Sequence, residues 1–138
     1  MNDSLLRNRS FDQIAIGESA SITHGMGAPG IALFAAVPGD LNPSHLAPVP
    51  ATAGGPVVAH GMWAQALVSA VIGTELPGPG TVLPARELRF AGPIAAGDRI
   101  TATVTEQAKH AARRTLRLAA AALARLVAAR SARLGAAA

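Results

Sequence analysis

A chain of 138 residues has the size of one domain built around a single hydrophobic core. Half of its residues are apolar and only 14% are charged, which argues against a disordered chain. Only 3% are aromatic, which argues against a surface that binds nucleic acid by base stacking. The absence of cysteine excludes disulfides, thiolate nucleophiles and zinc sites built on cysteine, and it favours a reducing, cytoplasmic compartment.

Charge is distributed unevenly along the chain. The net charge is +4, but all eight acidic residues lie at or before Glu106 and seven of the twelve basic residues follow it. Because the basic residues of this tail alternate with Ala and Leu, we interpret it as a solvated face rather than a nucleic-acid site. The first residues are unlike a secretory signal, and no apolar run reaches the roughly 18 residues of a membrane helix. We expect neither a nucleic-acid nor a membrane partner, and we expect residues 1–10 to be flexible.

The first half of the chain predicts a strand, a short helix and a long loop. Residues 11–23 mix small, apolar and polar residues around a glycine, as a first strand after a turn does. Pro29 can open a helix with one apolar side, which the sequence Pro38-Gly39 should stop. Residues 39–56 are rich in proline, glycine and small residues, and they predict loop throughout.

The strongest helix pattern covers residues 60–73, HGMWAQALVSAVIG. It has almost no polar side, so we expect this helix to be covered on most sides and to stop at Gly73. The following stretch, TELPGPGT, predicts a rigid, turn-rich linker.

Two antiparallel strands are predicted next, joined through a Gly/Pro corner. One contains Glu87–Phe90 and the other contains Ile100–Thr105, and both alternate in polarity. The tail after residue 106 is ambiguous, because its Ala, Leu and Arg residues favour a helix while residues 115–118 alternate as a strand does. A buried helix followed by consecutive strands indicates an α+β fold.

The segment GDLNPSHL, residues 39–46, contains the first candidates for chemistry. Asp40 and His45 are an acid and a base that can share proton transfer, and Pro38 and Pro43 stiffen the loop that carries them. Asn42 can hold the turn through its own side chain. The alternative is a surface turn that happens to contain a histidine.

The start of the long helix contains the other candidates. The first amide groups of a helix lack intrahelical partners, so the N–H of Gly61 could face a developing oxyanion. His60 precedes it, and packing near the surface is the competing interpretation for this residue. The four histidines show no metal-ligand spacing, and His24 and His110 have no neighbour at useful spacing, so no metal site is expected.

Three stretches together carry a family resemblance: FAAVPGDLNPSHL, VVAHGMWAQALVSAVIGTELPGPGT and ELRFAGPIAAGDRITATV. The combination of G-D-x-N-P-x-H with a downstream H-G-M resembles the MaoC-like (R)-specific enoyl-CoA hydratases, over about residues 11–106. The details look most like the hydratase domain that is sometimes fused to a phosphate acyltransferase domain. In this sequence the segment between His45 and His60 is shorter than the family's usual one.

The resemblance implies one hot-dog domain over residues 1–138, in which a curved antiparallel sheet wraps a long central helix. It maps two closing strands onto residues 113–123 and 126–134, and on this basis we expect strands in the tail. It also implies that His45 removes a proton from water as the water attacks C3 of a trans-2-enoyl thioester, while Asp40 protonates C2. The Gly61 N–H would stabilise the thioester oxygen, and Asn42, His60 and Gly61 would bind substrate.

The predicted function is therefore (R)-specific hydration of trans-2-enoyl-CoA to (R)-3-hydroxyacyl-CoA. The thioester is the substrate, no cofactor or metal is expected, and the resemblance implies a homodimer or a higher homo-oligomer. A hot-dog acyl-CoA thioesterase and a non-catalytic acyl-CoA-binding protein are the alternatives.

Overall fold

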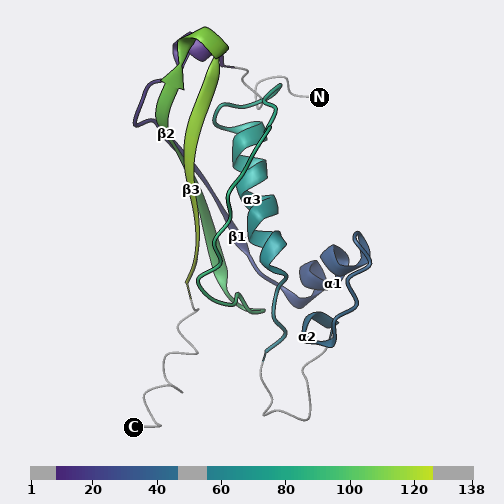
Figure 1. Ribbon diagram of the computed structural model, residues 1–138. Helices are drawn as coiled ribbons and strands as arrows, with labels where there is room; N and C mark the ends of the chain where they lie inside the picture. Colours follow the sequence, from purple (N-terminus) through teal and green to yellow (C-terminus); the bar gives the residue numbers. More distant parts are fainter. Residues whose placement is uncertain (1–8, 47–55, 126–138) are drawn as a thin grey trace, which may run out of the picture. The chain divides into compact units, whose positions relative to one another are not determined.

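The computed structural model describes residues 9–46 and 56–125 (Figure 1). Its elements in chain order are η1 (Phe11–Gln13), β1 (Ser19–Gly25), α1 (Ala28–Ala36), α2 (Pro43–Leu46), α3 (Gly61–Thr74), β2 (Arg99–His110), η3 (Ala111–Arg113) and β3 (Thr115–Arg125). The α+β class is thereby confirmed. No helix among the described residues is long and apolar enough to span a membrane.

Contacts group these residues into two compact units. Within the described ranges, the first unit comprises residues 9–22, 65–88 and 101–122, and the second comprises residues 23–46, 56–64, 89–100 and 123–125. Each unit is therefore assembled from segments that are far apart in the sequence.

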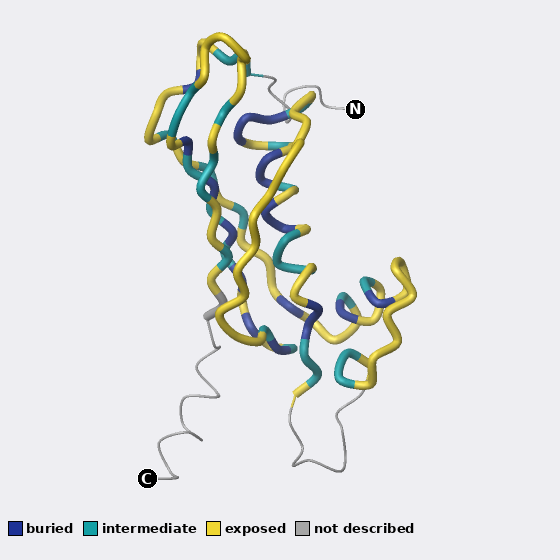
Figure 2. The backbone as a smooth tube through the Cα atoms, in the orientation of Figure 1, coloured by how far each residue is buried: buried dark blue, intermediate teal, exposed yellow. Residues whose placement is uncertain are grey.

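The sheet has the strand order β1-β2-β3. In the first unit, the hydroxyls of Ser19 and Thr105 lie 2.7 Å apart and those of Ser21 and Thr103 lie 2.8 Å apart, which fixes an antiparallel register for β1 and β2. The alternate residues of β2, Ala102 and Val104, are fully buried. The predicted alternation is thus confirmed, with hydroxyls on one face of β2 and buried residues on the other. Figure 2 shows the burial along the backbone.

The described part of the tail is a strand. β3 follows β2 through η3 and through Arg114, which adopts the left-handed conformation at φ 47°. The strand expected over 113–123 is confirmed from Thr115 on, and the helical alternative is wrong for residues 115–125. Pairing with β2 supplies the backbone partners that a helix would otherwise provide, so tertiary context overrides the helix propensity of alanine. The strand expected over 126–134 lies outside the described residues.

α3 confirms the predicted helix and ends one residue later than predicted, at Thr74. In the first unit it buries one side, formed by Leu67, Val68, Val71 and Ile72. Ala66, Ser69 and Gly73 are exposed. The expectation that this helix is covered on most sides is therefore correct for one side only.

The stretch after α3 is a packed helix end rather than a linker. The N–H of Leu76 donates to the carbonyl of Val71 at 3.0 Å, and the N–H of Gly78 donates to that of Ile72 at 2.9 Å. These bonds satisfy carbonyls that the last helical turn leaves without partners. Residues 75–80 are turn-rich, as predicted, but Leu76, Pro77 and Gly78 are buried in the core of the first unit.

The first of the two strands predicted after α3 is absent from the structure. Residues 81–93 are irregular and exposed, and the segment that follows forms a single bridge between Val58 and Ala95 within the second unit. The alternation at Glu87–Phe90 is real, but the ladder pairing that makes a strand is missing there. Pro84 also lacks the N–H that a ladder needs.

Glu106 is the buried acid of the first unit, with 1% of its surface exposed. Its Oε1 accepts a hydrogen bond from the Ala108 N–H at 3.1 Å, while Oε2 has no hydrogen-bond partner among the described residues. Burial raises the pKa of the Glu106 carboxyl, against the opposing effects of the Ala108 and Arg117 backbone N–H groups and the Lys109 charge. Relative to the unfolded chain, folding therefore shifts the equilibrium of this carboxyl toward its neutral form.

Leu76→Ala should lower the free energy of unfolding by about 2–5 kcal/mol, because it leaves a cavity in a core position that is fully buried. The matched control is Val82→Ala in the irregular segment after α3, where the side chain is 83% exposed and the expected change is within about 0.5 kcal/mol. Urea unfolding of the two variants and the parent measures both effects. Equal losses at the two positions would contradict the assignment of Leu76 to the core.

Glu106→Gln should change how stability depends on pH. Because the folded pKa lies above the ordinary value of 4.5, the carboxyl's contribution is fully present below that value and is lost as pH rises through the raised pKa. Gln does not ionise, so the stability of the Glu106→Gln variant has no such pH-dependent contribution at this position. The melting temperature of the parent should therefore fall relative to that of the variant as pH increases from about 4.5 toward neutrality, and parallel curves would refute the raised pKa.

Candidate functional site

The end of α1 positions Asp40. Gly39 adopts a positive φ of 75°, which turns the chain so that the Asp40 N–H donates to the Ala35 carbonyl at 3.0 Å. The Pro38-Gly39 turn thus follows the end of α1 and also positions the Asp40 side chain. The side chain of Asp40 remains 47% exposed, and its Oδ1 accepts a hydrogen bond from the Asn42 N–H at 3.2 Å.

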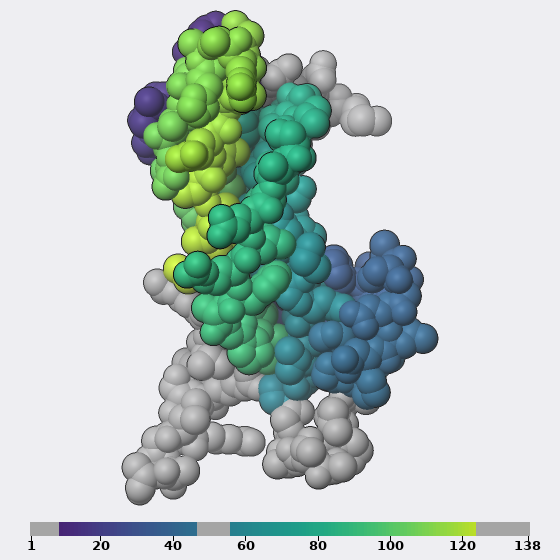
Figure 3. All heavy atoms as spheres, in the orientation of Figure 1, coloured from purple at the N-terminus to yellow at the C-terminus, as the bar shows by residue number. Residues whose placement is uncertain are grey.

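Asn42 caps the short helix α2, which lies in a region predicted as loop throughout. Its Oδ1 accepts hydrogen bonds from the N–H and the hydroxyl of Ser44, at 3.1 and 2.9 Å, and its carbonyl accepts one from the His45 N–H at 2.9 Å. A capping side chain satisfies the first amide groups of a helix, and proline suits the first helical position, so a short helix forms here. Figure 3 shows α1 and α2 together as one blue region of the surface. The remainder of the expected loop, residues 47–55, lies outside the described residues.

His45 is held by a backbone carbonyl 13 residues away in the sequence. Its Nδ1 lies 2.6 Å from the carbonyl oxygen of Val58, and the ring is 14% exposed. A carbonyl can only accept a hydrogen bond, so Nδ1 carries the proton. In the neutral ring Nε2 therefore has a free lone pair, and it lies 3.9 Å from Asp40 Oδ2.

His60 completes the cluster, immediately before α3. It is buried, with 5% of its surface exposed, and its ring stacks on that of His45 with centroids 3.7 Å apart and planes 26° apart. The ring of Phe34 lies on it at 5.2 Å. Its Nε2 lies 3.6 Å from Asp40 Oδ2, and neither ring nitrogen has a hydrogen-bond partner among the described residues.

The three side chains form what we call the Asp40–His45–His60 cluster, which lies entirely within the second unit. The distances from the carboxylate to the two imidazoles, 3.9 and 3.6 Å, exceed a direct hydrogen bond. A half-exposed acid beside a base with a free lone pair can donate one proton and accept another.

Gly61 is the first residue of α3 and lies against an aromatic ring. A Cβ at this position would meet Cε1 of Phe90 at 3.1 Å, which is closer than ordinary van der Waals contact. The ring of Phe90 therefore occupies space beside Gly61 that was expected to be open to a ligand. Because Phe90 is 59% exposed, its ring has room to move.

Sequence reasoning identified Asp40, His45 and His60 but missed the residues that hold them. The Val58 carbonyl cannot be recognised in the sequence, because every residue has a backbone carbonyl. Phe34 was interpreted only as an apolar helix position, and Phe90 only as a strand residue. The histidine pair also escaped the search for ligand spacing, because the fold rather than the sequence brings these rings together.

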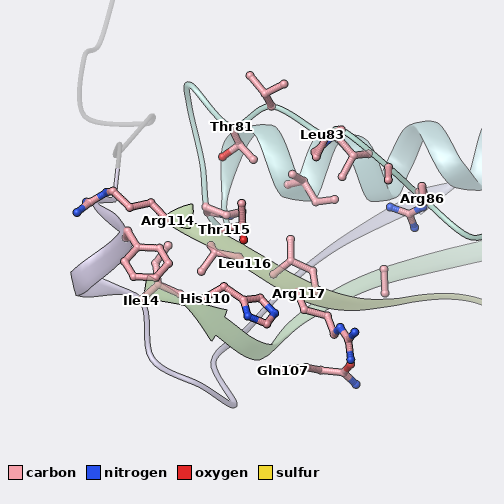
Figure 4. A pocket seen from close by; sticks show the side chains of 18 of the residues that line it. Ile14, Thr81, Leu83, Arg86, Gln107, His110, Arg114, Thr115, Leu116 and Arg117 are labelled. Carbon is pink, nitrogen blue, oxygen red and sulfur yellow. The ribbon is translucent and has the colours of Figure 1, made fainter. Parts of the chain in front are cut away.

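A cavity of about 1180 Å³ lies in the first unit and contains none of the predicted site residues (Figure 4). Its lining includes Arg86, Arg114 and Arg117 together with apolar side chains such as Leu83 and Leu116. The cavity is positively charged, but the acid–base geometry lies in the second unit, so we place the candidate site there.

Comparisons with known proteins point to one family. A family model described as "MaoC like domain" matches residues 18–126. The (R)-specific enoyl-CoA hydratase of Rhodospirillum rubrum is 40% identical over 97 residues, which are 69% of this chain and 67% of that protein. The 3-hydroxybutyryl-CoA dehydratase of Methylorubrum extorquens is 34% identical over 116 residues, which are 83% of this chain and 74% of that protein.

Solved structures agree with these matches. The unliganded R-hydratase from Pseudomonas aeruginosa superposes with a TM-score of 0.80 at 34% identity, over 86% of this chain and 77% of that one. The (R)-hydratase of Aeromonas caviae superposes with a TM-score of 0.76 at 33% identity, over 80% of this chain and 86% of that one. The predicted hot-dog fold is thereby confirmed.

The tautomer of His45 provides a direct test of this site. Nitrogen-15 chemical shifts at a pH where the ring is neutral should show a protonated Nδ1 and an unprotonated Nε2, because the Val58 carbonyl accepts from Nδ1. His110, an exposed residue, serves as the control and should show no such fixed tautomer. A proton on Nε2 of His45 would contradict the geometry described above.

Proposed function

The chain belongs to the MaoC-like domain family, and from that membership we propose that it is a hydro-lyase that hydrates trans-2-enoyl-CoA to (R)-3-hydroxyacyl-CoA. Relatives at 34–40% identity carry the names (R)-specific enoyl-CoA hydratase and 3-hydroxybutyryl-CoA dehydratase, which describe the same addition of water in its two directions. One observation supports the proposal most strongly. The Val58 carbonyl leaves the Nε2 of His45 free on the side where Asp40 lies.

Hydration adds a hydroxyl to C3 and a proton to C2 of the enoyl thioester. In the proposed mechanism, Nε2 of His45 removes a proton from water while the water oxygen bonds to C3. The C2–C3 double bond becomes a single bond, and the electron pair moves onto the thioester as an enolate. The protonated carboxyl of Asp40 then delivers its proton to C2. The free enzyme is restored when the proton on His45 returns to Asp40.

The enolate-like oxygen requires a hydrogen-bond donor while its charge develops. We assign this role to the Gly61 N–H, at the start of the 14-residue helix α3, where unpaired amide groups and the helix dipole favour negative charge. His60 and Asn42 are assigned to substrate binding and to holding the loop. His60 holds the loop through its contacts with the Asp40 carboxylate and the His45 ring, and Asn42 holds it through its cap on α2.

The proposed substrate is an acyl-CoA thioester, with no resident cofactor or metal needed for the addition of water.

The proposed assembly is a homodimer or a higher homo-oligomer. Large apolar side chains on the second unit support association, since Leu33, Val37 and Leu41 are 71%, 84% and 69% exposed. Sedimentation velocity measures the mass directly, and a monomer at micromolar concentration would refute this part of the proposal.

Asp40→Asn and His45→Ala should each lower the rate of crotonyl-CoA hydration by roughly 100-fold or more, because each removes one proton-transfer group. The measurement is loss of the ultraviolet absorbance of the enoyl thioester, and chiral analysis of the product should give the (R) isomer. His110→Ala is the matched control and should leave the rate unchanged, since it removes an exposed histidine outside the Asp40–His45–His60 cluster.

A thioesterase would instead release free CoA. Because the chain contains no cysteine, a thiol reagent in the same assay reports CoA alone. Thiol release without formation of the hydroxyacyl product would identify a thioesterase. Binding of enoyl-CoA by the folded protein with neither reaction would identify a non-catalytic acyl-CoA-binding protein.

A further inference from the structure

We propose that the Asp40–His45–His60 cluster binds a divalent transition-metal ion, with Zn²⁺ as the probe, and that bound metal inhibits the enzyme. The inhibition rests on the proposed hydratase function, whereas metal binding does not. The metal in this proposal is an inhibitor rather than a cofactor, because it competes for the same atoms that transfer protons.

The donor set is the first observation. One oxygen of Asp40 and one nitrogen from each histidine all lie within 4.8 Å of one another. Two imidazoles and one carboxylate are a common protein ligand set for Zn²⁺ and its first-row neighbours. All three residues lie in the second unit, on the loop after α1, on α2 and immediately before α3.

His60 provides the second, independent observation. Only 5% of this residue is exposed, and both ring nitrogens lack a hydrogen-bond partner among the described residues. Burying a polar group without a partner is unfavourable, so a ligand that accepts the imidazole lone pair would relieve that cost. Nε2 of His60 already lies 3.6 Å from the Asp40 carboxylate, and a metal ion between the two would contact both.

His45 is oriented as metal-binding histidines commonly are. Its Nδ1 donates to the Val58 carbonyl at 2.6 Å, and such a bond from the far nitrogen fixes ring orientation and makes Nε2 a better ligand. This outer contact is the same one that frees Nε2 as the proposed base. Proton transfer and metal binding therefore use one lone pair, which cannot serve both at once.

Two of the three donor pairs require only a small adjustment, and the third pair, one nitrogen from each histidine, lies within 4.8 Å. In a four-coordinate zinc site with bonds of about 2.0–2.1 Å, ligand atoms lie roughly 3.3–3.4 Å apart. The carboxylate oxygen is 3.6 Å from one imidazole nitrogen and 3.9 Å from the other, so each pair must close by a few tenths of an ångström. Asp40 is half-exposed, so its carboxylate can move toward the two imidazole nitrogens while the Val58 carbonyl holds the His45 ring. Water can take the fourth position on the exposed side.

The first experiment measures binding without activity. Zn²⁺ titration by calorimetry, together with the visible spectrum of bound Co²⁺, should show one ion per chain in the parent. His60→Ala and His45→Ala should each weaken binding by at least roughly tenfold, because each removes a direct ligand. The matched controls, His24→Ala and His110→Ala, remove histidines outside the cluster and should stay within about twofold of the parent. Circular dichroism confirms that each variant is folded.

The second experiment measures crotonyl-CoA hydration with added Zn²⁺ and then with a chelator. Zn²⁺ should lower the rate in proportion to the occupancy measured by calorimetry, and the chelator should restore it. Lower pH should weaken binding, because protons compete for the imidazoles. No binding, or equal loss in control and cluster variants, would overturn the site. Binding with an unchanged or higher rate would overturn the inhibition. Intact binding in a protein with no hydratase activity would overturn the proposed function and leave the site standing.

Discussion

The hydrogen bond from His45 Nδ1 to the Val58 carbonyl, 2.6 Å long, is the contact on which the site depends. It sets the tautomer, so it decides which ring nitrogen can accept a proton. It also ties α2 to the segment that leads into α3, where the Val58 N–H donates in return to the Ser44 carbonyl at 3.0 Å. This reciprocal pair of bonds brings His45 and His60 into register, and the stacking of their rings follows from it. Without the pair, Asp40 would face a ring free to turn either nitrogen toward it.

Around that contact, each neighbouring element has a defined task. The positive φ at Gly39 turns the chain after α1, the Asn42 cap nucleates α2, and His60 ends the segment at the start of α3. Burial is graded across the cluster, from the enclosed His60 through the nearly enclosed His45 to the half-exposed Asp40. A base is thus protected from bulk water while the acid remains accessible, an arrangement that suits both the transfer of protons to a substrate and the exchange of protons with solvent.

Sequence patterns predicted much of this and failed for physical reasons. Helix α3 and strand β2 were predictable because apolar periodicity is a local property, and Asp40 and His45 because proline and glycine restrict the few residues between them. The strand character of Thr115–Arg125 depends on pairing with β2, which no local propensity contains. The irregular path of residues 81–93 likewise reflects missing ladder partners despite good alternation. His60 was found through the H-G-M motif, but its stacking on His45 depends on tertiary contacts that no spacing shows. The Val58 carbonyl could not be found, because every residue carries a backbone carbonyl.

The contact between Gly61 and the ring of Phe90 links two positions 29 residues apart. A methyl group at residue 61 displaces the ring, and a smaller side chain at residue 90 makes room for it. The effects of changes at the two positions therefore depend on each other. The outcome of a substitution at the start of α3 thus depends on the side chain at residue 90, although no strand or helix joins the two positions.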